Sequence, residues 1–330
     1  MLASLAAASV LGARSVLAAP AAAKHRLGVF FAGWSDLALG VKEREQAKKE
    51  REKILKALAE LGYVEGRNLT VDWRFFDMDF SKAPQMAAEL VRLKVDVLLT
   101  AGTPQTKALR AATTTIPIVT SVNDPVASGL TQSLARPGGN ITGLTNQHPA
   151  TPAKQVELFR MLVPRLDRLV IVGDVRYTGD RELVRPAENA ARMAGMIADV
   201  RMVDPSDVER VFSEMKGFAA RAALLGYVDM DMAGVARLAI RHGVATMHFA
   251  SEYVEHGGLL SFSPYHANEM QRTVSIIDKI FRGMDPAQIP WELPDRTHLA
   301  INLGTAKLLG LKVPADLLLR ADQVVGSPSS

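Results

Sequence analysis

Short apolar runs alternate with amphipathic segments along most of this sequence, and this rhythm constrains the fold more than any other feature. Each run is rich in Val, Ile, Leu or Phe and is closed by Gly, Asp, Asn or Ser. Unbroken short runs of this kind are typical of strands that are buried on both faces of a parallel sheet. They occupy residues 28–33, 69–75, 95–102, 116–122, 169–175, 198–204, 222–229 and 243–249.

The segments between these runs carry apolar residues at helical spacing, for example Ile54, Leu58 and Leu61 before Gly62. Alternating strands and helices predict parallel sheets with right-handed crossovers. The rhythm occurs twice, with four strands on each side of a Gly- and Asn-rich connection at 133–146. We therefore expect an α/β fold of two doubly wound parallel-sheet lobes joined by hinge strands.

The lobes are not expected to be continuous in sequence. One should comprise residues 24–143 and 264–291, and the other residues 144–260 and 294–326. The reason is a late helical pattern at 266–283, which follows a candidate hinge strand and predicts a return of the chain to the first lobe.

Composition narrows the classes of function. Hydrophobic residues make up 48% of the chain and charged residues 22%, which is typical of a globular protein. The net charge is +4, and Lys and Arg are scattered among Asp and Glu. Nucleic acid is therefore not expected as a partner, because phosphate binding needs a concentrated basic face. The absence of cysteine excludes disulfides, thiol catalysis and Cys-ligated zinc.

The N-terminal residues 1–23 are nearly all Ala, Leu, Val and Ser. We interpret them as a signal peptide cleaved near Ala18–Ala23, which predicts a periplasmic protein. The alternative is a disordered Ala-rich tail, because Arg14 interrupts the apolar run and no basic residue precedes it. Beyond residue 24 no apolar stretch approaches the ~20 residues of a membrane span, so no span is expected in the mature chain.

A ligand in an open α/β sheet binds beyond the carboxyl ends of the strands. The candidates in the first lobe follow three of the apolar runs and are Trp34, Ser35, Gly102, Thr103, Asn123 and Asp124. Trp34 is suited to stacking on an apolar ligand or to packing between the lobes. Thr103 is predicted to cap a helix with Pro104 at its first position, where free N–H groups favour an anion. Asp124 fits a ligand amino group or an Asx turn before Pro125.

The second lobe offers candidates of two kinds after its own strands. Tyr177 and Tyr227 are suited to closing over a ligand, and Asp174, Asp229 and Glu252 to pairing with a cation. Taken singly, each of these residue types is more often a loop residue or a helix cap.

Several motifs of enzymes and metalloproteins are missing. The stretch ARPGGN at 135–140 matches neither GxGxxG nor GxxxxGK, so nucleotide binding has no support. There is no HExxH motif and no GxSxG elbow. We therefore expect no metal, no cofactor and no catalytic residues, and a binding protein in place of an enzyme.

Four stretches resemble one known family. They are LGYVEGRNLTVDWRF at 61–75, the long block at 87–145, GGLLSFSP at 257–264 and the segment at 299–325. All four are similar to ABC-transporter substrate-binding proteins with the type I periplasmic-binding-protein fold. Phe262 and Ser263 depart from the Tyr and Gly common in that family, and these departures bear on the ligand more than on the fold.

The resemblance implies a function and its partners. Such a protein captures a small solute, here an amino acid or a small organic anion, between its lobes and delivers it to the permease of an ABC importer. Hinge closure around the ligand is the expected mechanism. The alternative from another class is a sensory module that reports ligand occupancy to a signalling partner.

Overall fold

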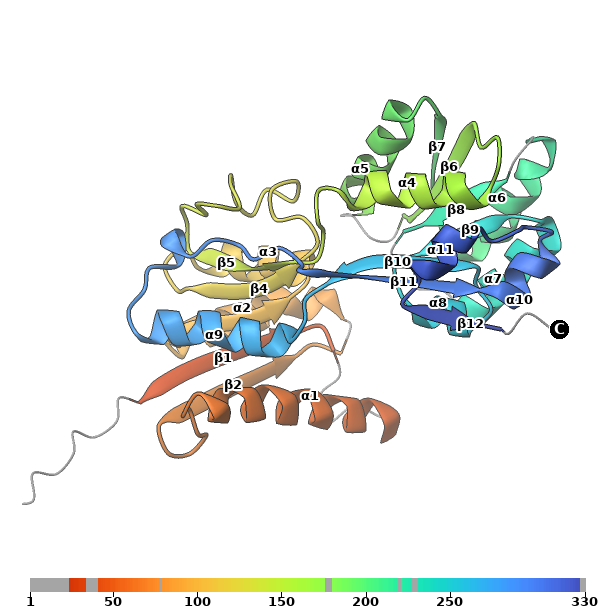
Figure 1. The fold of residues 1–330 in the computed structure, drawn as a ribbon. Helices are drawn as coiled ribbons and strands as arrows, with labels where there is room; N and C mark the ends of the chain where they lie inside the picture. The colour runs from red at the N-terminus through yellow and green to blue at the C-terminus, as the bar shows by residue number, and fades with distance from the viewer. Residues whose placement is uncertain are drawn as a thin grey trace, which may run out of the picture.

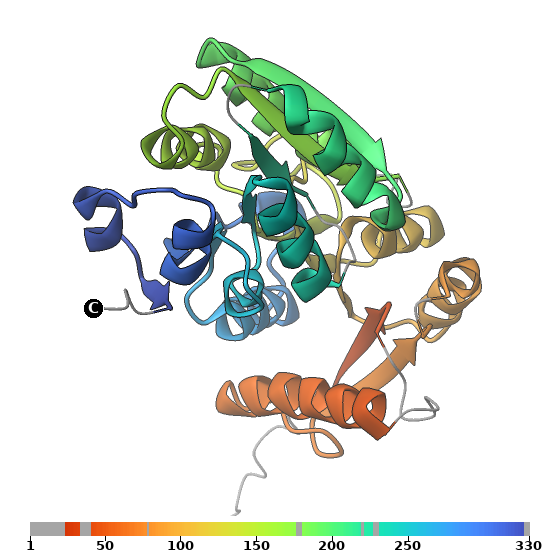
Figure 2. The same cartoon turned by 90° about the vertical axis from the view of Figure 1, so that its right-hand side faces the viewer.

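The chain folds into two α/β lobes, each built on its own sheet, and strands β10 and β11 run between them (Figure 1). A second view shows the first lobe beneath the second, with helix α1 lying across its outer side (Figure 2). The computed structural model describes residues 24–33, 41–77, 79–175, 180–218, 221–226 and 231–326. The predicted fold class of two doubly wound lobes joined by hinge strands is confirmed.

The first sheet has the strand order β2-β1-β3-β4-β5, and all of its pairs are parallel. Strands β1, β3 and β4 are largely buried on both faces, as the unbroken runs predict, whereas β2 at the edge of the sheet is only partly buried. The strands are β1 (His25–Phe31), β2 (Leu69–Phe75), β3 (Val97–Ala101), β4 (Ile118–Val122) and β5 (Ile141–Thr145).

Helices cover both faces of this sheet. Leu58 of α1 and Ile277 of α9 pack in the cluster on one face, and Leu90 of α2 and Leu109 of α3 in the cluster on the other. The α9 helix is remote in sequence, so the first lobe is completed by a late segment. The helices are α1 (Val41–Glu60), α2 (Ala83–Arg92), α3 (Thr103–Ala112) and α9 (Glu269–Phe281).

The second sheet has the order β12-β11-β10-β9-β8-β6-β7. Its pairs are parallel except β10 with β11, which are antiparallel. The strands are β6 (Arg168–Asp174), β7 (Ile197–Val203), β8 (Ala222–Leu225), β9 (Ala245–His248), β10 (Leu260–Tyr265), β11 (Arg296–Asn302) and β12 (Gln323–Val325).

Two groups of helices enclose this sheet. Phe159 of α4, Val184 of α5 and Leu317 of α11 pack on one face, and Phe212 of α6 and Val235 of α7 on the other. The helices are α4 (Thr151–Leu162), α5 (Asp180–Met193), α6 (Val208–Glu214), α7 (Met232–His242), α8 (Glu252–Glu255), α10 (Leu303–Leu308) and α11 (Ala315–Leu319). Short 3-10 segments are Phe80–Lys82, Pro205–Asp207, Met215–Gly217 and Pro286–Gln288.

Each sheet contains more strands than the four that were predicted for each lobe. Strand β5 lies inside the 133–146 stretch that was predicted to be only a connection, and β10, β11 and β12 follow the last predicted run. The β5 sequence, ITGLT, is short and half polar, and β10 contains Pro264. Neither strand is an unbroken apolar run, so periodicity alone did not detect them, although β10 lies where a candidate hinge strand was expected before the 266–283 helix.

Three segments of the chain pass between the lobes: β5 to α4, β10 to α9, and residue 292 to β11. The backbone of Glu292 extends the first sheet by pairing with Gly143 and Thr145. The Arg272 guanidinium lies 2.9 Å from Glu292 and 2.6 Å from Asp295, so it ties α9 to the third crossing. These contacts support the proposed lobe boundaries, which stay a prediction.

The predicted signal peptide, residues 1–23, lies outside the described residues. Among the helices that the structure does describe, none is long and apolar enough to span a membrane.

Candidate functional site

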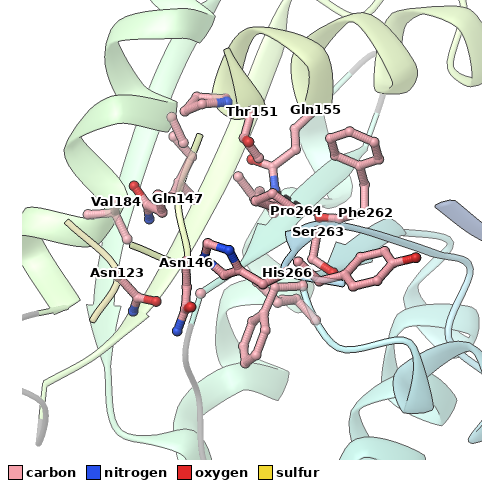
Figure 3. Close-up of a pocket in the computed structure, with 18 of the residues that line it drawn as sticks. Asn123, Asn146, Gln147, Thr151, Gln155, Val184, Phe262, Ser263, Pro264 and His266 are labelled. Atoms are coloured by element: carbon pink, nitrogen blue, oxygen red, sulfur yellow. Dashed lines mark hydrogen bonds between the residues drawn. The ribbon is translucent and has the colours of Figure 1, made fainter. Parts of the chain in front are cut away.

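A cavity of about 260 Å³ lies between the two lobes, at the carboxyl ends of strands from both sheets. This is where ligands bind in open α/β sheets, because strand ends and helix starts present free polar groups there. Its described lining consists of Asn123, Asn146, Gln147, Thr151, Pro152, Gln155, Ile171, Val184, Ala187, Leu224, Leu225, Gly226, Phe249, Phe262, Ser263, Pro264, Tyr265, His266 and Glu269. Figure 3 shows these side chains coming together from both lobes.

The side of the cavity formed by the first lobe is polar. Asn123 follows β4, and Asn146 and Gln147 follow β5. The hydroxyl of Ser121 lies 3.0 Å from Asn146 Oδ1 and 3.0 Å from Glu269 Oε1. This hydroxyl therefore lies between the ends of two strands and the start of α9.

The side formed by the second lobe is largely apolar. Val184 and Ala187 of α5 and Leu224 of β8 line it, together with Phe249 beyond β9. These residues belong to, or adjoin, the core of that lobe, so the apolar wall is rigid. A ligand with an apolar body and a polar end could place its body against this wall and its polar end against the first lobe.

The first turn of α4 and the hinge strand β10 form the remaining wall. Gln155 donates from Nε2 to the carbonyl oxygen of Phe262 at 3.3 Å, which links α4 to β10. Thr151 and Ser263 add hydroxyls to the lining. Figure 3 shows Thr151 and Gln155 near Phe262, Ser263 and Pro264.

One predicted ligand residue, Asn123, lines this cavity. Gly102 and Thr103 do not, although Ala101 and Gln105 beside them line a separate hollow of about 330 Å³. The predicted cap is off by one residue: Gly102 is the N-cap of α3 and Thr103 is its first helical residue. Gly102 has φ 93°, which Gly adopts readily and Thr does not, so the cap falls on Gly102.

The described carboxylates among the candidates lie outside the cavity lining. Asp124 Oδ1 accepts the N–H groups of Val126 and Ala127 at 3.0 and 2.9 Å, which is the local turn weighed as its alternative. Asp174 is fully buried at the end of β6, and Glu252 is exposed at the start of α8. A ligand-binding role for these three residues, as for Thr103, stays a prediction.

The remaining candidates, Trp34, Ser35, Tyr177, Tyr227 and Asp229, lie outside the described residues. Among the residues that the structure describes, no group of three or more His, Cys, Asp or Glu is placed to hold a metal ion.

Several lining residues were not among the candidates, notably Gln147, Gln155, His266 and Glu269. Three of them lie on crossings or on α9, which periodicity does not connect with the strand ends of the first lobe. A signal was present at Phe262 and Ser263, the two departures from the family pattern, because both line the cavity.

His248 is a buried titratable group directly behind the apolar wall. It is 1% exposed, and its ring lies 4.2 Å from that of Phe249. Its Nδ1 accepts the N–H of Ala250 at 3.0 Å. Burial penalises the charged imidazole and lowers the pKa of His248 from 6.5 to about 4.

This depressed pKa predicts acid sensitivity of the fold. Between pH 6.5 and 4 the unfolded state binds a proton that the folded state does not, so stability falls as the pH falls. The loss should reach about 3 kcal/mol at pH 4. His248→Asn keeps an acceptor for Ala250 and removes the titration. Urea unfolding at pH 7 and pH 4 should show a smaller loss in the variant; equal losses would refute the assignment.

The geometry defines a fold class: two doubly wound lobes, three crossings and a cavity between the lobes are the architecture of type I periplasmic binding proteins. The chain belongs to the ABC transporter substrate binding protein family, whose sequence model matches residues 41–325.

Individual proteins agree with this assignment. A tyrosine-binding protein of Clostridioides difficile (strain R20291) is 26% identical over 283 residues, which are 83% of this chain and 80% of that protein. The ABC domain from Streptococcus pneumoniae in complex with L-Trp superposes with a TM-score of 0.74 at 23% identity, covering 92% of this chain and 100% of that one. The ligand-free, open structure of a substrate-binding protein with adhesive properties from Clostridium difficile gives 0.69 at 21% identity, covering 92% and 100%.

Proposed function

We propose that this protein is exported, captures an amino acid with an apolar side chain between its lobes, and delivers it to the permease of an ABC importer. In this role it acts as a binding protein and not as an enzyme. The relatives described above bind tyrosine and L-Trp, which supports the ligand class. Membership of the substrate-binding family supports the importer as partner and the periplasm as location.

The observation that carries the proposal is the division of the cavity between the lobes. Among the described lining residues, Asn123, Asn146, Gln147, His266 and Glu269 of the first lobe and the crossings form the polar wall, and α5, β8 and Phe249 of the second lobe form the apolar wall. A bound amino acid therefore touches both lobes, and it stabilises the closed arrangement because only that arrangement offers both sets of contacts.

A thermal-shift panel tests the ligand class. L-Tyr, L-Trp, L-Phe and L-Leu are compared with malate and succinate, and with D-Tyr as the matched stereochemical control. The best ligand should stabilise the fold by about 2.7 kcal/mol at a concentration of 100 times Kd. We expect an aromatic L-amino acid to give the largest shift. A shift with the organic anions and none with any amino acid would contradict the proposal.

A further inference from the structure

Hydrogen-bond acceptors gather in the corner of the cavity nearest the crossings. The Ser121 hydroxyl has one proton and two acceptors at 3.0 Å, Asn146 Oδ1 and Glu269 Oε1. It donates fully to only one of them at a time. One of these two oxygens is therefore left without the hydroxyl proton at any time.

His266 adds a third acceptor to this corner. Its side chain is 5% exposed and lines the cavity beside Asn146 (Figure 3). Nε2 lies 2.8 Å from the carbonyl oxygen of Thr145, which only accepts, so Nε2 carries the proton. In the neutral ring Nδ1 is then an acceptor, and this buried atom has no hydrogen-bond partner in the described part of the chain. A buried acceptor without a partner is costly, so a donor that reaches it binds favourably.

The negative charge in this corner of the cavity favours a ligand donor that is positively charged. Among the lining residues that the structure describes, Glu269 is the one carboxylate, and no Lys or Arg accompanies it. An ammonium group supplies both the positive charge and three donors. A second carboxylate would be repelled.

We propose that Glu269 and His266 form the subsite for the ligand's amino group. This inference rests on the proposed function and adds an orientation to it. The amino group lies at the crossings, and the apolar side chain extends toward α5 and β8. Because His266 directly follows β10 and Glu269 is the first residue of α9, occupancy of the subsite acts directly on the second crossing.

Two substitutions test the subsite in the full-length protein. Glu269→Gln removes the charge and keeps the shape of the side chain. His266→Gln keeps a donor in reach of Thr145 and removes the acceptor at Nδ1. Glu60→Gln, an exposed carboxylate at the end of α1, is the charge control.

Calorimetry with two ligand pairs gives the readout. The pairs are L-Tyr with 3-(4-hydroxyphenyl)propionate, and L-Trp with indole-3-propionate; each second member lacks only the amino group. Glu269→Gln should weaken binding of the amino acid about ten- to hundredfold, as expected for a charged hydrogen bond. His266→Gln should weaken it about tenfold. Neither variant should weaken binding of the des-amino partner, and Glu60→Gln should change nothing.

The outcomes separate this inference from the proposed function. If the wild type binds no amino acid, the proposed function fails and the subsite with it. If the wild type binds L-Tyr or L-Trp but both variants lose equal affinity for the two members of each pair, the residues are only structural and the subsite is wrong. If Glu269→Gln does not fold, two measurements still test the subsite. They are the effect of His266→Gln on each ligand pair, and the preference of the wild type for the amino acid over the partner that lacks the amino group.

Discussion

Gly143→Ala should leave almost no folded protein. Gly143 lies in the middle of β5, opposite Thr120 of β4, with φ 151°. A Cβ at this position would overlap the backbone carbonyl of Thr120. A backbone group, unlike a side chain, has no rotamer that moves it away, so the two strands would have to separate. The cost should exceed about 4 kcal/mol, which places it among the most damaging single substitutions.

Soluble yield and thermal unfolding followed by circular dichroism measure this effect. Gly139→Ala is the matched control, because a Cβ there meets nothing within 4 Å. It should be expressed and should melt like the wild type. A Gly143→Ala protein that melts within a few degrees of the wild type would show that β4 and β5 are not as close as described.

The same contact has a consequence for the binding site. Strand β5 ends at Thr145, whose carbonyl accepts from His266, and Asn146 follows in the cavity wall. Any Gly143→Ala protein that does fold should therefore bind ligand poorly, because the polar wall depends on the position of β5.

Ser263→Trp should abolish ligand binding while leaving the fold intact. Ser263 lies on β10 at the wall of the cavity, where Figure 3 shows it between Pro264 and His266. It is only partly buried, and strands accommodate Trp well. The indole would occupy the space that a ligand needs. Affinity in calorimetry should fall by at least about a hundredfold, or ~2.7 kcal/mol.

Thr297→Trp is the matched control for bulk. Thr297 is exposed on β11, the strand paired with β10, and it does not line this cavity. It should keep the affinity and the melting temperature of the wild type. If Ser263→Trp bound the ligand normally, the cavity between the lobes would not be the binding site.

Three of the strands that were predicted correctly share one property. Runs such as 28–33, 95–102 and 169–175 are buried on both faces, so nearly every residue in them is apolar and the run is visible locally. Strand β10 is different. Ser261 and Phe262 are buried, Ser263 faces the cavity and Pro264 begins the crossing, so its composition reflects three environments at once.

The candidate site was predicted less well, and the reason is distance along the chain. Asn123 was found because it follows a strand of the first lobe. Ser121 and Glu269 are 148 positions apart and meet only because α9 returns to the first sheet. No local spacing encodes such a meeting.

The sequence by itself determined the α/β class, the two lobes and the family, because burial of parallel strands and the start and end of helices leave local patterns. Only the tertiary structure decided which polar groups share the cavity. Phe262 and Ser263 could be marked from sequence as relevant to the ligand, but their place on the hinge strand beside His266 depends on β10 pairing with β11. The backbone hydrogen bonds of a sheet are the same for every sequence, so they do not determine which strands pair. The pairing of strands remote in sequence is determined by how their side chains pack in the folded chain.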